Sequence, residues 1–485
     1  MKRFVENEKM NEKRNVYHSQ KKKKYFYSLD EVFNPKSIVL IGVPPNPNTV
    51  GYRMLKGMVD FGYSGRIQIV DVHKQEVLGF YPYSRVTEIS YDIDLAIVMV
   101  PAKIVPLIVK DSVEKNVKGI VIISSGFSET GETGRILEEE LVKLIHGTRT
   151  RIVGPNCLGI YCPSSRITFN SSFSKESGSV ACISQSGGIG SHFARFIIDR
   201  GLGISKLVSV GNKCDLQIND YIEYFSEDPE TEVISCYVEE LKDARRFIEI
   251  AGDIARKKPV VIWKGGRSKT GTRVVKSHTG SIAGSTDLYT AAFKQTGVIE
   301  ANGLGELTDF VLTFQCLQPR NIKNIGVISG PAGINVAIVD VFEKLGFNFP
   351  VFSQETKEEL KNLLPWFAAI SNPTDLTMGT TATRGHVQSR FELLKNMLRV
   401  VAKDEEIDLV VTGSGDVTID YAKVLIEASK KSEKPIIVIC FPRMNWNVKG
   451  IKLLGKAGIP VYLNPQGAAK SIKALTSRSK FLSLY

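Results

Sequence analysis

The chain has 485 residues, of which 43% are hydrophobic and 24% charged, and a formal net charge of +12, a balance typical of a globular protein with about three domains. It contains no apolar run of the roughly 18 residues that a membrane-spanning helix needs, and its N-terminus lacks the apolar centre of a signal peptide. We therefore expect a cytoplasmic protein with no membrane partner.

Half of the excess positive charge lies in residues 1–28, which hold nine Lys or Arg residues and three Glu residues, a net charge of +6. Low hydrophobicity and high charge predict that this basic tail is disordered and solvated. The rest of the chain is only mildly basic and shows no basic surface interleaved with aromatic residues, so no nucleic-acid partner is expected.

The seven cysteines are an odd number, and most of them lie in apolar or strand-like segments. Only Cys157 and Cys162 are close neighbours, and no second pair of thiols or histidines follows at the spacing of a zinc site. Buried free thiols are therefore predicted, and no metal site. Cys157 is not expected to be a nucleophile, because nothing in the sequence singles out a base for it.

The first predicted unit opens with an apolar run at 37–43 and a helical pattern at 52–61. Further β-branched runs follow at 66–72, 95–100 and 119–125. Near-continuous apolar strands that alternate with helices predict a parallel sheet covered on both faces. In such a fold, ligands bind at the loops that follow the strands.

The first of these loops, residues 42–51, is rich in proline and lacks the G-x-G-x-x-G fingerprint of dinucleotide sites. A nicotinamide-dependent enzyme is therefore disfavoured. Val100 and Ser124 stand at the ends of later strands, which are the usual positions of ligand contacts in open parallel sheets.

A second unit begins with a strand at 179–184 that turns through Gln185, Ser186, Gly187 and Gly188 into a helical pattern. The free N–H groups of a helix start, together with the Ser186 hydroxyl, suit an anion such as phosphate. Serine and glycine also cap helices that bind no ligand, and the pattern alone leaves both interpretations open.

Later in this unit, a strand at 233–238 ends at Glu239 and Glu240. Carboxylates at the carboxyl end of a parallel strand lie on the ligand side of the sheet. One of them is suited to hold the far nitrogen of a catalytic imidazole and fix its tautomer. The alternative is an acidic pair exposed to solvent.

The most distinctive segment surrounds His278, which is expected in a loop of Gly, Ser, Thr and Ala residues before a helical pattern at 287–297. With a pKa of about 6.5, a neutral imidazole is available to attack a phosphoryl group without a strong base. Lys264 and Arg267 make the approach to this segment positive, which suits a phosphorylated substrate. His278 is therefore the candidate phosphoryl carrier, and a surface or capping histidine is the alternative.

A third unit begins near residue 324, and its strands are predicted at residues 325–329, 408–412, 435–441 and 460–463. The loops at 330–333 and 372–376 repeat the order of strand, small-residue turn and helix. The chain is thus predicted to contain three doubly wound α/β units in series.

Seven short motifs follow one another along the chain: Phe33-Asn34-Pro35-Lys36-Ser37-Ile38, Val100-Pro101-Ala102-Lys103, Gly154-Pro155-Asn156-Cys157-Leu158-Gly159, Ser184-Gln185-Ser186-Gly187, Gly211-Asn212-Lys213, Ser277-His278-Thr279-Gly280 and Asn372-Pro373-Thr374-Asp375-Leu376. In this order and spacing they resemble the alpha, CoA-binding subunit of ADP-forming (NDP-forming) acyl-CoA synthetases, relatives of succinyl-CoA synthetase. The resemblance runs from about Leu29 to the C-terminus.

The resemblance implies an α/β protein in which a Rossmann-like CoA-binding domain precedes two flavodoxin-like, doubly wound CoA-ligase domains. The implied boundaries are 1–28 for the basic tail, 29–155 for the CoA-binding domain, 156–319 for the CoA-ligase domain with the histidine, and 320–485 for the second flavodoxin-like domain.

The resemblance also implies that His278 is phosphorylated and carries the phosphoryl group between an acyl phosphate and a nucleotide. Glu239 is the implied carboxylate partner of His278. The implied phosphate-binding residues are Ser186, Gly187, Gly188 and Gly280. The reaction would be acyl-CoA + phosphate + ADP ⇌ carboxylic acid + CoA + ATP, with catalysis mainly by positioning and charge stabilisation.

Coenzyme A is expected at the first domain, near Gly42, Gly51, Val100, Pro101 and Ser124. ADP or ATP with Mg²⁺ is expected on a separate ATP-grasp beta subunit in a hetero-oligomer, because the chain shows no G-x-x-x-x-G-K-[ST] loop and ends shortly after the third unit. The other expected ligands are a small carboxylic acid and phosphate.

Three segments depart from the family pattern: the first loop has Val43-Pro44-Pro45 where small residues are usual, Glu240 stands where glycine is common, and the third unit has Gly330-Pro331-Ala332-Gly333 in place of a run of glycines. These departures leave open how CoA is held and which of Glu239 and Glu240 faces the histidine. The alternative function is a non-catalytic regulatory protein that binds CoA or acyl-CoA.

Overall fold

The computed structural model describes residues 29–279, 286–330, 332–376, 390–441 and 448–485. The basic tail at residues 1–28, for which disorder is predicted, lies outside these residues. The chain divides into two compact units, one formed by Met1–Ala194 with Ile204–Thr296 and the other by Arg195–Gly203 with Gly297–Tyr485.

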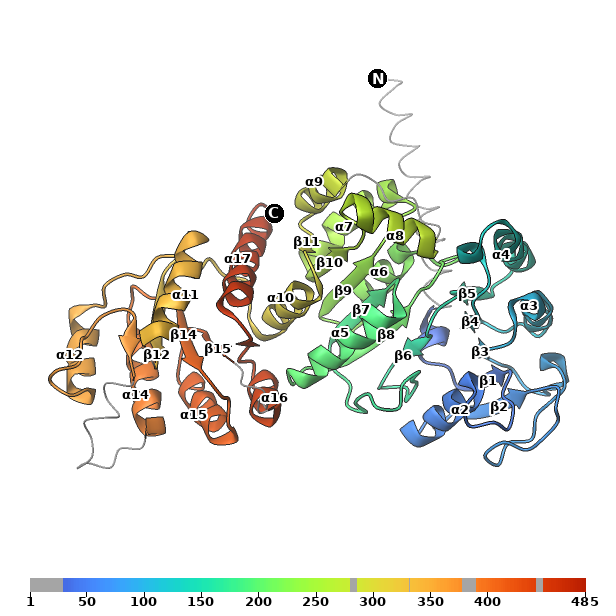
Figure 1. Cartoon of the computed structure of the whole chain (residues 1–485), viewed down its shortest axis with the longest axis horizontal. Helices are drawn as coiled ribbons and strands as arrows, with labels where there is room; N and C mark the ends of the chain where they lie inside the picture. The colour runs from blue at the N-terminus through green and yellow to red at the C-terminus, as the bar shows by residue number, and fades with distance from the viewer. Residues whose placement is uncertain (1–28, 280–285, 331, 377–389, 442–447) are drawn as a thin grey trace, which may run out of the picture. The chain divides into compact units, whose positions relative to one another are not determined.

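The first sheet of unit 1 has five parallel strands in the order β2-β1-β3-β4-β5. The strands are β1 (Ser37–Ile41), β2 (Arg66–Val70), β3 (Leu95–Val98), β4 (Gly119–Ile122) and β5 (Arg151–Val153). Its helices are α2 (Val50–Phe61), α3 (Val105–Glu114) and α4 (Glu132–Ile145). Figure 1 shows α3 and α4 together on one face of this sheet and α2 on the other. Every residue of β1, β3 and β4 is buried, as expected for strands covered on both faces.

The second sheet of unit 1 contains four parallel strands in the order β10-β9-β7-β8. These strands are β7 (Val180–Ser184), β8 (Ile204–Ser209), β9 (Val233–Val238) and β10 (Val260–Lys264). A short strand, β6 (Ile160–Tyr161), pairs antiparallel with β8 and was not predicted. The helices that follow these strands are α5 (Gly187–Asp199), α6 (Ile218–Glu227), α7 (Ala244–Lys257), α8 (Lys269–Thr279) and α9 (Thr286–Thr296).

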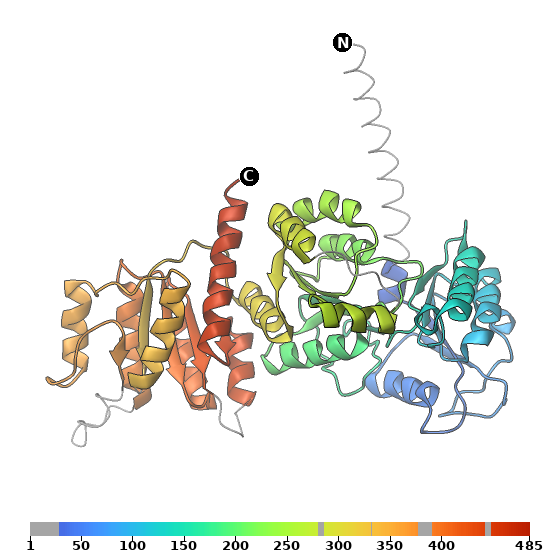
Figure 2. The same ribbon diagram turned by 45° about the horizontal axis from the view of Figure 1, so that its top comes forward.

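Unit 2 is built around a third parallel sheet, in the order β13-β12-β14-β15-β16. Its strands are β12 (Ile325–Ser329), β13 (Thr374–Asp375), β14 (Leu409–Ser414), β15 (Ile436–Cys440) and β16 (Val461–Tyr462). One face carries α12 (Gln354–Leu363), α14 (Arg390–Lys403), α15 (Ile419–Ser429) and α16 (Val448–Lys456). On the other face, α11 (Ala332–Lys344) lies against α17 (Pro465–Leu482), as Figure 2 shows. The remaining elements of the unit are β11 (Ile299–Ala301) and α10 (Leu304–Cys316).

One order of the parallel strands recurs in all three sheets: the first parallel strand along the chain lies between the second and the third. In a doubly wound sheet of this kind, the connections on the two sides of the first strand leave a crevice at its carboxyl end, and ligands bind there. The three crevices are expected at the ends of β1 and β3, of β7 and β9, and of β12 and β14. The prediction of doubly wound α/β units is confirmed.

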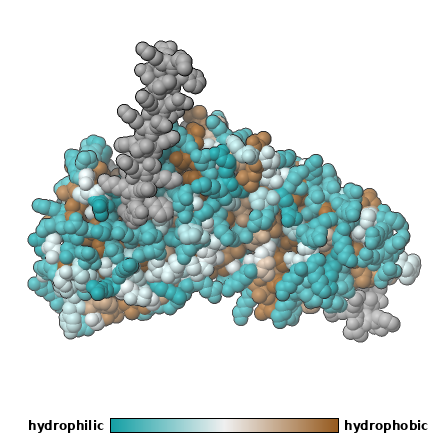
Figure 3. Space-filling view, turned by 180° about the vertical axis from the view of Figure 1, so that it is seen from behind, coloured by the Kyte–Doolittle hydropathy of each residue, from teal (hydrophilic) through white to brown (hydrophobic). Residues whose placement is uncertain are grey.

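Within the described ranges, no helix combines the length and the apolar character needed to cross a bilayer. Hydrophilic residues cover most of the face drawn in Figure 3, with hydrophobic residues between them.

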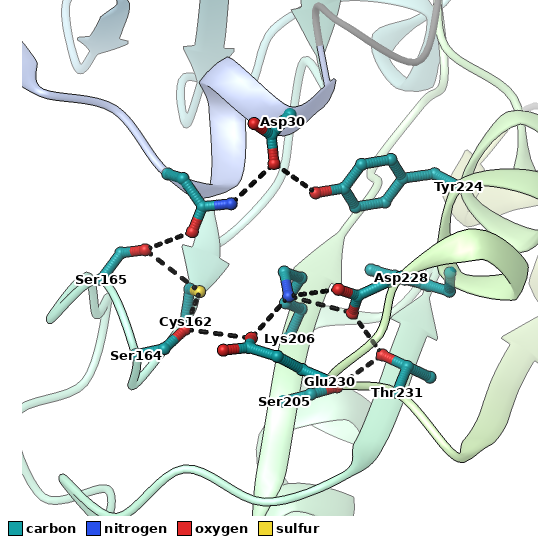
Figure 4. A network of polar contacts seen from close by, with 12 residues as sticks. Asp30, Cys162, Ser164, Ser165, Ser205, Lys206, Tyr224, Asp228, Glu230 and Thr231 are labelled. Atoms are coloured by element: carbon teal, nitrogen blue, oxygen red, sulfur yellow. Dashed lines mark hydrogen bonds and ion pairs between the residues drawn. The ribbon is translucent and has the colours of Figure 1, made fainter.

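A buried polar network stands on β8 of unit 1 and is drawn in Figure 4. The Lys206 ammonium, on a side chain that is 2% exposed, lies 2.9 Å from a carboxylate oxygen of Asp228 and 2.7 Å from one of Glu230. Thr231 donates a further hydrogen bond of 2.6 Å to Asp228. Although burial lowers the pKa of Lys206, the hydrogen bonds with Glu230 and Asp228 raise it above its usual value, so the ammonium is charged at neutral pH.

This network extends to the beginning of the described chain. Ser164 donates to Glu230 at 3.2 Å, and the neighbouring Ser165 donates to the Asn34 side chain at 2.6 Å. Asn34 in turn donates to Asp30 at 2.8 Å. Polar contacts thus connect the segment before β1, which holds Asp30 and Asn34, with the second sheet of the same unit (Figure 4).

Lys206→Met is expected to lower the free energy of unfolding by about 3–5 kcal/mol, because it leaves the buried Asp228 carboxylate without its cation. Lys257→Met is the matched control: the Lys257 ammonium pairs with Glu227 at 3.0 Å, with side chains 58% and 37% exposed. That exposed pair is worth less than about 1 kcal/mol. Urea unfolding of the two variants measures the difference, and equal losses would contradict the buried-charge interpretation.

Candidate functional site

Gln185 connects the carboxyl ends of β7 and β9, at the crevice of the second sheet. Its side-chain oxygen accepts hydrogen bonds from the backbone N–H groups of Glu239 at 2.6 Å and Glu240 at 3.1 Å. The backbone N–H of Gln185 donates to the Tyr237 carbonyl at 3.0 Å. The side chain is 5% exposed, and its amide nitrogen has no hydrogen-bond partner in the described part of the chain. A buried amide nitrogen of this kind is a donor available to a ligand.

Glu239 offers the complementary group at the same crevice. One of its carboxylate oxygens accepts from the Tyr237 hydroxyl at 3.2 Å, and the other is buried without a partner among the described residues. Burial, with a further contribution from Glu239, raises the pKa of Tyr237, so the hydroxyl remains a donor at neutral pH. Glu239 is 8% exposed, whereas Glu240 is half-buried. Of the two predicted carboxylates, Glu239 is therefore the one with a buried oxygen available for another group.

The predicted phosphate-binding segment begins α5 beside these residues. The Ser186 hydroxyl oxygen accepts from the Ile189 N–H at 3.4 Å and so caps the helix, and the hydroxyl donates to no group among the described residues. Gly187 has no room for a side chain, because an added Cβ would lie 2.4 Å from Leu158. Gly188 is exposed. The structure therefore brings Ser186, Gly187 and Gly188 to the same sheet edge as Glu239, at a helix start that suits an anion.

His278 lies in α8, where a loop was predicted. The helix Lys269–Thr279 begins directly after Ser268, whose hydroxyl oxygen accepts from the Gly271 N–H at 2.9 Å and caps the first turn. The helix begins at this Ser268 cap and continues through position 278. The His278 side chain and Gly280 lie outside the described residues, so their contacts stay predictions.

Lys264 adds a buried positive charge at the end of β10. The side chain is 2% exposed, its ammonium donates to the Gly265 carbonyl, and its nitrogen lies 5.0 Å from the centroid of the Tyr289 ring. Burial lowers the pKa of Lys264, against the attraction of Glu239.

The sequence identified Lys264 only as part of a positive approach to the histidine segment and assigned no role to Gln185 or Tyr237. The available signal was that each of the three residues lies at, or one residue from, the end of a strand.

The five residues predicted to bind CoA gather at the carboxyl edge of the first sheet. Gly42 follows β1 with a φ of +88°, and a Cβ there would lie 2.8 Å from the Met99 carbonyl oxygen. The Ser124 hydroxyl, after β4, donates to the Val100 carbonyl at 2.5 Å. Pro101 is exposed at the same edge. The structure thus assembles these residues around the crevice between β1 and β3.

Gly51 explains how α2 reaches this crevice. It stands in the first turn of the helix, where an added Cβ would lie 2.0 Å from the Gly42 carbonyl oxygen. Only glycine allows this approach, which holds the start of α2 against the loop after β1. Thr49 caps the helix by accepting from the Tyr52 N–H at 3.3 Å. The proline-rich loop, in which Pro44 is half-buried and Pro45 is exposed, therefore leads into a capped helix start at the sheet edge. Such a helix start fits the phosphate groups of CoA.

The loops after the two sheets of unit 1 are joined through Glu129 and Asn212. One Glu129 oxygen accepts from the Gly126 N–H at 2.6 Å, two residues after Ser124, and the other accepts from the Asn212 side chain at 2.6 Å. Although burial raises the pKa of Glu129, the hydrogen bonds from Asn212 and Gly126 outweigh it and lower the pKa, so the carboxylate is charged at neutral pH. The predicted CoA edge and the crevice of the second sheet are therefore held together by charge-assisted hydrogen bonds.

The cysteines are free thiols, as predicted, and five of the seven are buried. The Cys157 thiol donates to the Ile122 carbonyl at 3.3 Å, and burial raises its pKa to about 12. A thiol that stays protonated at neutral pH is a poor nucleophile, in agreement with the sequence prediction.

Two family models match the chain. A model described as CoA binding domain matches residues 36–163, and one described as succinyl-CoA ligase like flavodoxin domain matches residues 177–314. The first covers the sheet with Gly42 and Ser124, and the second covers the sheet with Gln185 and Glu239.

Similar proteins are named as ligases. The chain is 36% identical over 460 residues to "Acetate–CoA ligase [ADP-forming] II subunit alpha" of Pyrococcus furiosus, covering 93% of this chain and 98% of that protein. It is 36% identical over 456 residues to "Acetate–CoA ligase [ADP-forming] I" of Archaeoglobus fulgidus, of whose length it spans 64%. A solved structure of the dinucleotide-forming acetyl-coenzyme A synthetase 1 of Ca. Korarchaeum cryptofilum, in complex with phosphate and ADP, matches with a TM-score of 0.80, 30% identity and coverage of 94% and 97% of the two chains.

Proposed function

The chain belongs to the family of ADP-forming acetate–CoA ligase alpha subunits, and on this premise we propose that it is the CoA-binding subunit of an ADP-forming acyl-CoA synthetase. The reaction is acyl-CoA + phosphate + ADP ⇌ carboxylic acid + CoA + ATP. The enzyme acts in the cytoplasm, and its acyl group is a small carboxylic acid.

The observation that carries this proposal is the pair of buried polar atoms at the crevice of the second sheet. The Gln185 amide nitrogen and one Glu239 carboxylate oxygen have no partners within the described ranges. Leaving such groups unpaired costs about 1–3 kcal/mol each, more for the charged one, so a ligand or another side chain is expected to contact them. Both stand beside the start of α5, which suits a phosphate group.

The chemistry takes three displacement steps. A phosphate oxygen attacks the thioester carbonyl carbon, the C–S bond breaks, and CoA leaves as a thiolate that takes up a proton. An imidazole nitrogen of His278 then attacks the phosphorus of the acyl phosphate, the P–O bond breaks, and the carboxylate leaves. Finally, an oxygen of the ADP β-phosphate attacks the phosphohistidine, the N–P bond breaks, and ATP forms.

The predicted site residues of the second sheet take distinct roles in these steps. Glu239 accepts a hydrogen bond from the imidazole, orients the ring and stabilises the positive charge of the attacking histidine. The start of α5, with Ser186, Gly187 and Gly188, receives the phosphoryl oxygens, and Gly280 completes that site. These fixed donors lower the barrier because they meet charge where it develops.

CoA is held at the carboxyl edge of the first sheet by Gly42, Gly51, Val100, Pro101 and Ser124. The bridge from Glu129 to Asn212 supports this assignment, because it joins the Ser124 loop to the second sheet, where the acyl phosphate is consumed. ADP and its Mg²⁺ are held by a partner chain, an ATP-grasp beta subunit, in a hetero-oligomer.

Purification of the chain with and without its partner tests the proposal. With acetyl-CoA, phosphate and ADP, the complete enzyme should form ATP and release CoA in a 1:1 ratio, and the chain alone should form none. ATP formation by the chain alone would contradict the assignment of the nucleotide site to a partner. A complete enzyme that binds CoA and forms no ATP from any of a series of short-chain acyl-CoAs would contradict the reaction.

A further inference from the structure

Lys213 occupies an unusual position in the loop that follows β8. Its backbone is left-handed, with a φ of +57°, and its N–H donates to the Val210 carbonyl at 3.2 Å. The Val210 N–H in turn donates to the Ser184 carbonyl at 2.9 Å, directly before Gln185. Lys213 therefore stands at the carboxyl edge of the second sheet, on the side of β7 opposite to Glu239.

The residue Lys213 is 2% exposed, and none of the hydrogen bonds and ion pairs found among the described residues involves its ammonium. The other two lysines near this edge are engaged. The Lys264 ammonium donates to the Gly265 carbonyl, and the Lys242 ammonium donates to the Lys213 carbonyl at 3.5 Å. A charge on so buried a residue is costly when no opposite charge contacts it, so this ammonium is available to an anionic ligand.

The charged groups around Lys213 are Lys242, Glu239 and Glu240 after β9, and Glu138 of α4. Burial is the main cause that lowers the pKa of Lys213 to about 8, with Lys242 adding to it and the three carboxylates opposing it. At pH 7 the side chain is therefore mostly a cation. An anion bound beside it would stabilise that cation and raise its pKa again.

We propose that Lys213 is a further substrate-contacting residue, whose ammonium binds the phosphate that enters the reaction and the phosphoryl group of the acyl phosphate. This inference rests on the proposed function. A phosphate dianion at the start of α5 lies among the negative charges of Glu239 and Glu240, and repulsion from them would weaken its binding. The ammonium of Lys213 compensates for that repulsion, together with the amide nitrogen of Gln185.

The test compares Lys213→Gln with Lys242→Gln, a matched control on an exposed neighbouring lysine. In the complete enzyme, Lys213→Gln should raise the KM for phosphate about 10- to 100-fold, the loss expected for one charge-assisted hydrogen bond. The KM for CoA should change less than about twofold, and Lys242→Gln should leave both values within about twofold of the wild type. An unchanged KM for phosphate in Lys213→Gln would overturn the inference.

The pH dependence gives a readout that a purely structural role would not move. The ammonium is present below a pKa of about 8 and lost above it, so the wild-type KM for phosphate should rise as the pH increases from 7 to 9. That rise should be absent in Lys213→Gln and shifted to higher pH in Lys213→Arg, since arginine stays charged. The same rise in wild type and Lys213→Gln would contradict the proposal.

Calorimetric titration of inorganic phosphate into the full chain, in complex with its partner, separates this inference from the proposed function. If the wild type forms no ATP and yet binds phosphate, and Lys213→Gln binds it at least tenfold more weakly, the function fails and the role of Lys213 stands. If ATP forms and both proteins bind phosphate equally, the function stands and the inference fails. CoA binding by Lys213→Gln and its Lys213→Met counterpart verifies folding.

Discussion

His278→Ala is expected to abolish ATP formation by the complete enzyme, with a fall in kcat of at least about four orders of magnitude. Alanine offers no nitrogen to receive the phosphoryl group, so the acyl phosphate would have to react with ADP directly. The binding of CoA to the first sheet should stay unchanged, because Gly42, Gly51 and Ser124 lie at the edge of that sheet and His278 follows the second. Steady-state ATP formation and CoA titration measure the two effects.

His146→Ala is the matched control, because His146 is exposed at the C-terminal cap of α4. It should keep the wild-type kcat. A His278→Ala enzyme that retains a tenth or more of the wild-type kcat would contradict the role of the histidine as carrier.

Glu239→Gln should lower kcat by about two to four orders of magnitude, the range seen when a carboxylate that orients a catalytic histidine becomes an amide. Glutamine keeps the shape of the side chain and an oxygen for the Tyr237 hydroxyl, which lies 3.2 Å from the carboxylate. It removes the negative charge that stabilises a positively charged imidazole. The KM for CoA should be unaffected. In a plot of kcat against pH, the acidic limb set by the imidazole should shift to lower pH, because the negative charge that favours the protonated ring is gone.

Glu240→Gln distinguishes the two neighbouring carboxylates. Glu240 is half-buried and its backbone N–H is 3.1 Å from the Gln185 oxygen, so its amide variant should keep the fold of the loop. We expect a change in kcat of less than about fivefold. A larger loss in Glu240→Gln than in Glu239→Gln would assign the partner role to Glu240.

The sequence predicted the sheets well, because buried parallel strands are encoded locally by short apolar runs between helices. The first strand, predicted at 37–43, is β1 at Ser37–Ile41, and the run predicted at 325–329 is β12 at Ile325–Ser329. β6 and β13 escaped prediction, and β13 lies within the segment 372–376 that was predicted as a loop. A strand of two residues carries no periodicity of its own and is defined by its pairing, here with β8 and β12.

For the candidate site, some positions were predicted correctly from the sequence and the position of His278 in a loop was not. The motif residues Ser186 and Glu239 lie at strand ends, where sequence patterns point to ligand contacts, and the structure brings both to one crevice. His278 was expected in a loop because of the small residues that follow it, but the Ser268 cap begins a helix that runs through it. The signal for this helix is therefore its N-terminal cap at Ser268, which lies ten residues before the histidine.

Gln185 and Lys213 show what the sequence could not reveal. Both residues are buried, the Gln185 amide nitrogen has no partner in the described ranges, and the surroundings of both depend on which strands are neighbours in the sheet. The order of β9, β7 and β8 places the two residues on adjacent strand ends, although 28 positions separate them in the sequence. No local pattern records that adjacency.

The central claim is that a phosphoryl group passes through His278, and phosphorylation of the protein itself tests it most directly. The complete enzyme is incubated with acetyl-CoA and radiolabelled phosphate, without ADP, and the labelled chain is digested and mapped. The label should be acid-labile and base-stable, reside in the peptide that contains His278, disappear on addition of ADP as labelled ATP forms, and be absent in His278→Ala. An enzyme that forms ATP from acetyl-CoA but carries no such label, or carries it equally in His278→Ala, would contradict the claim.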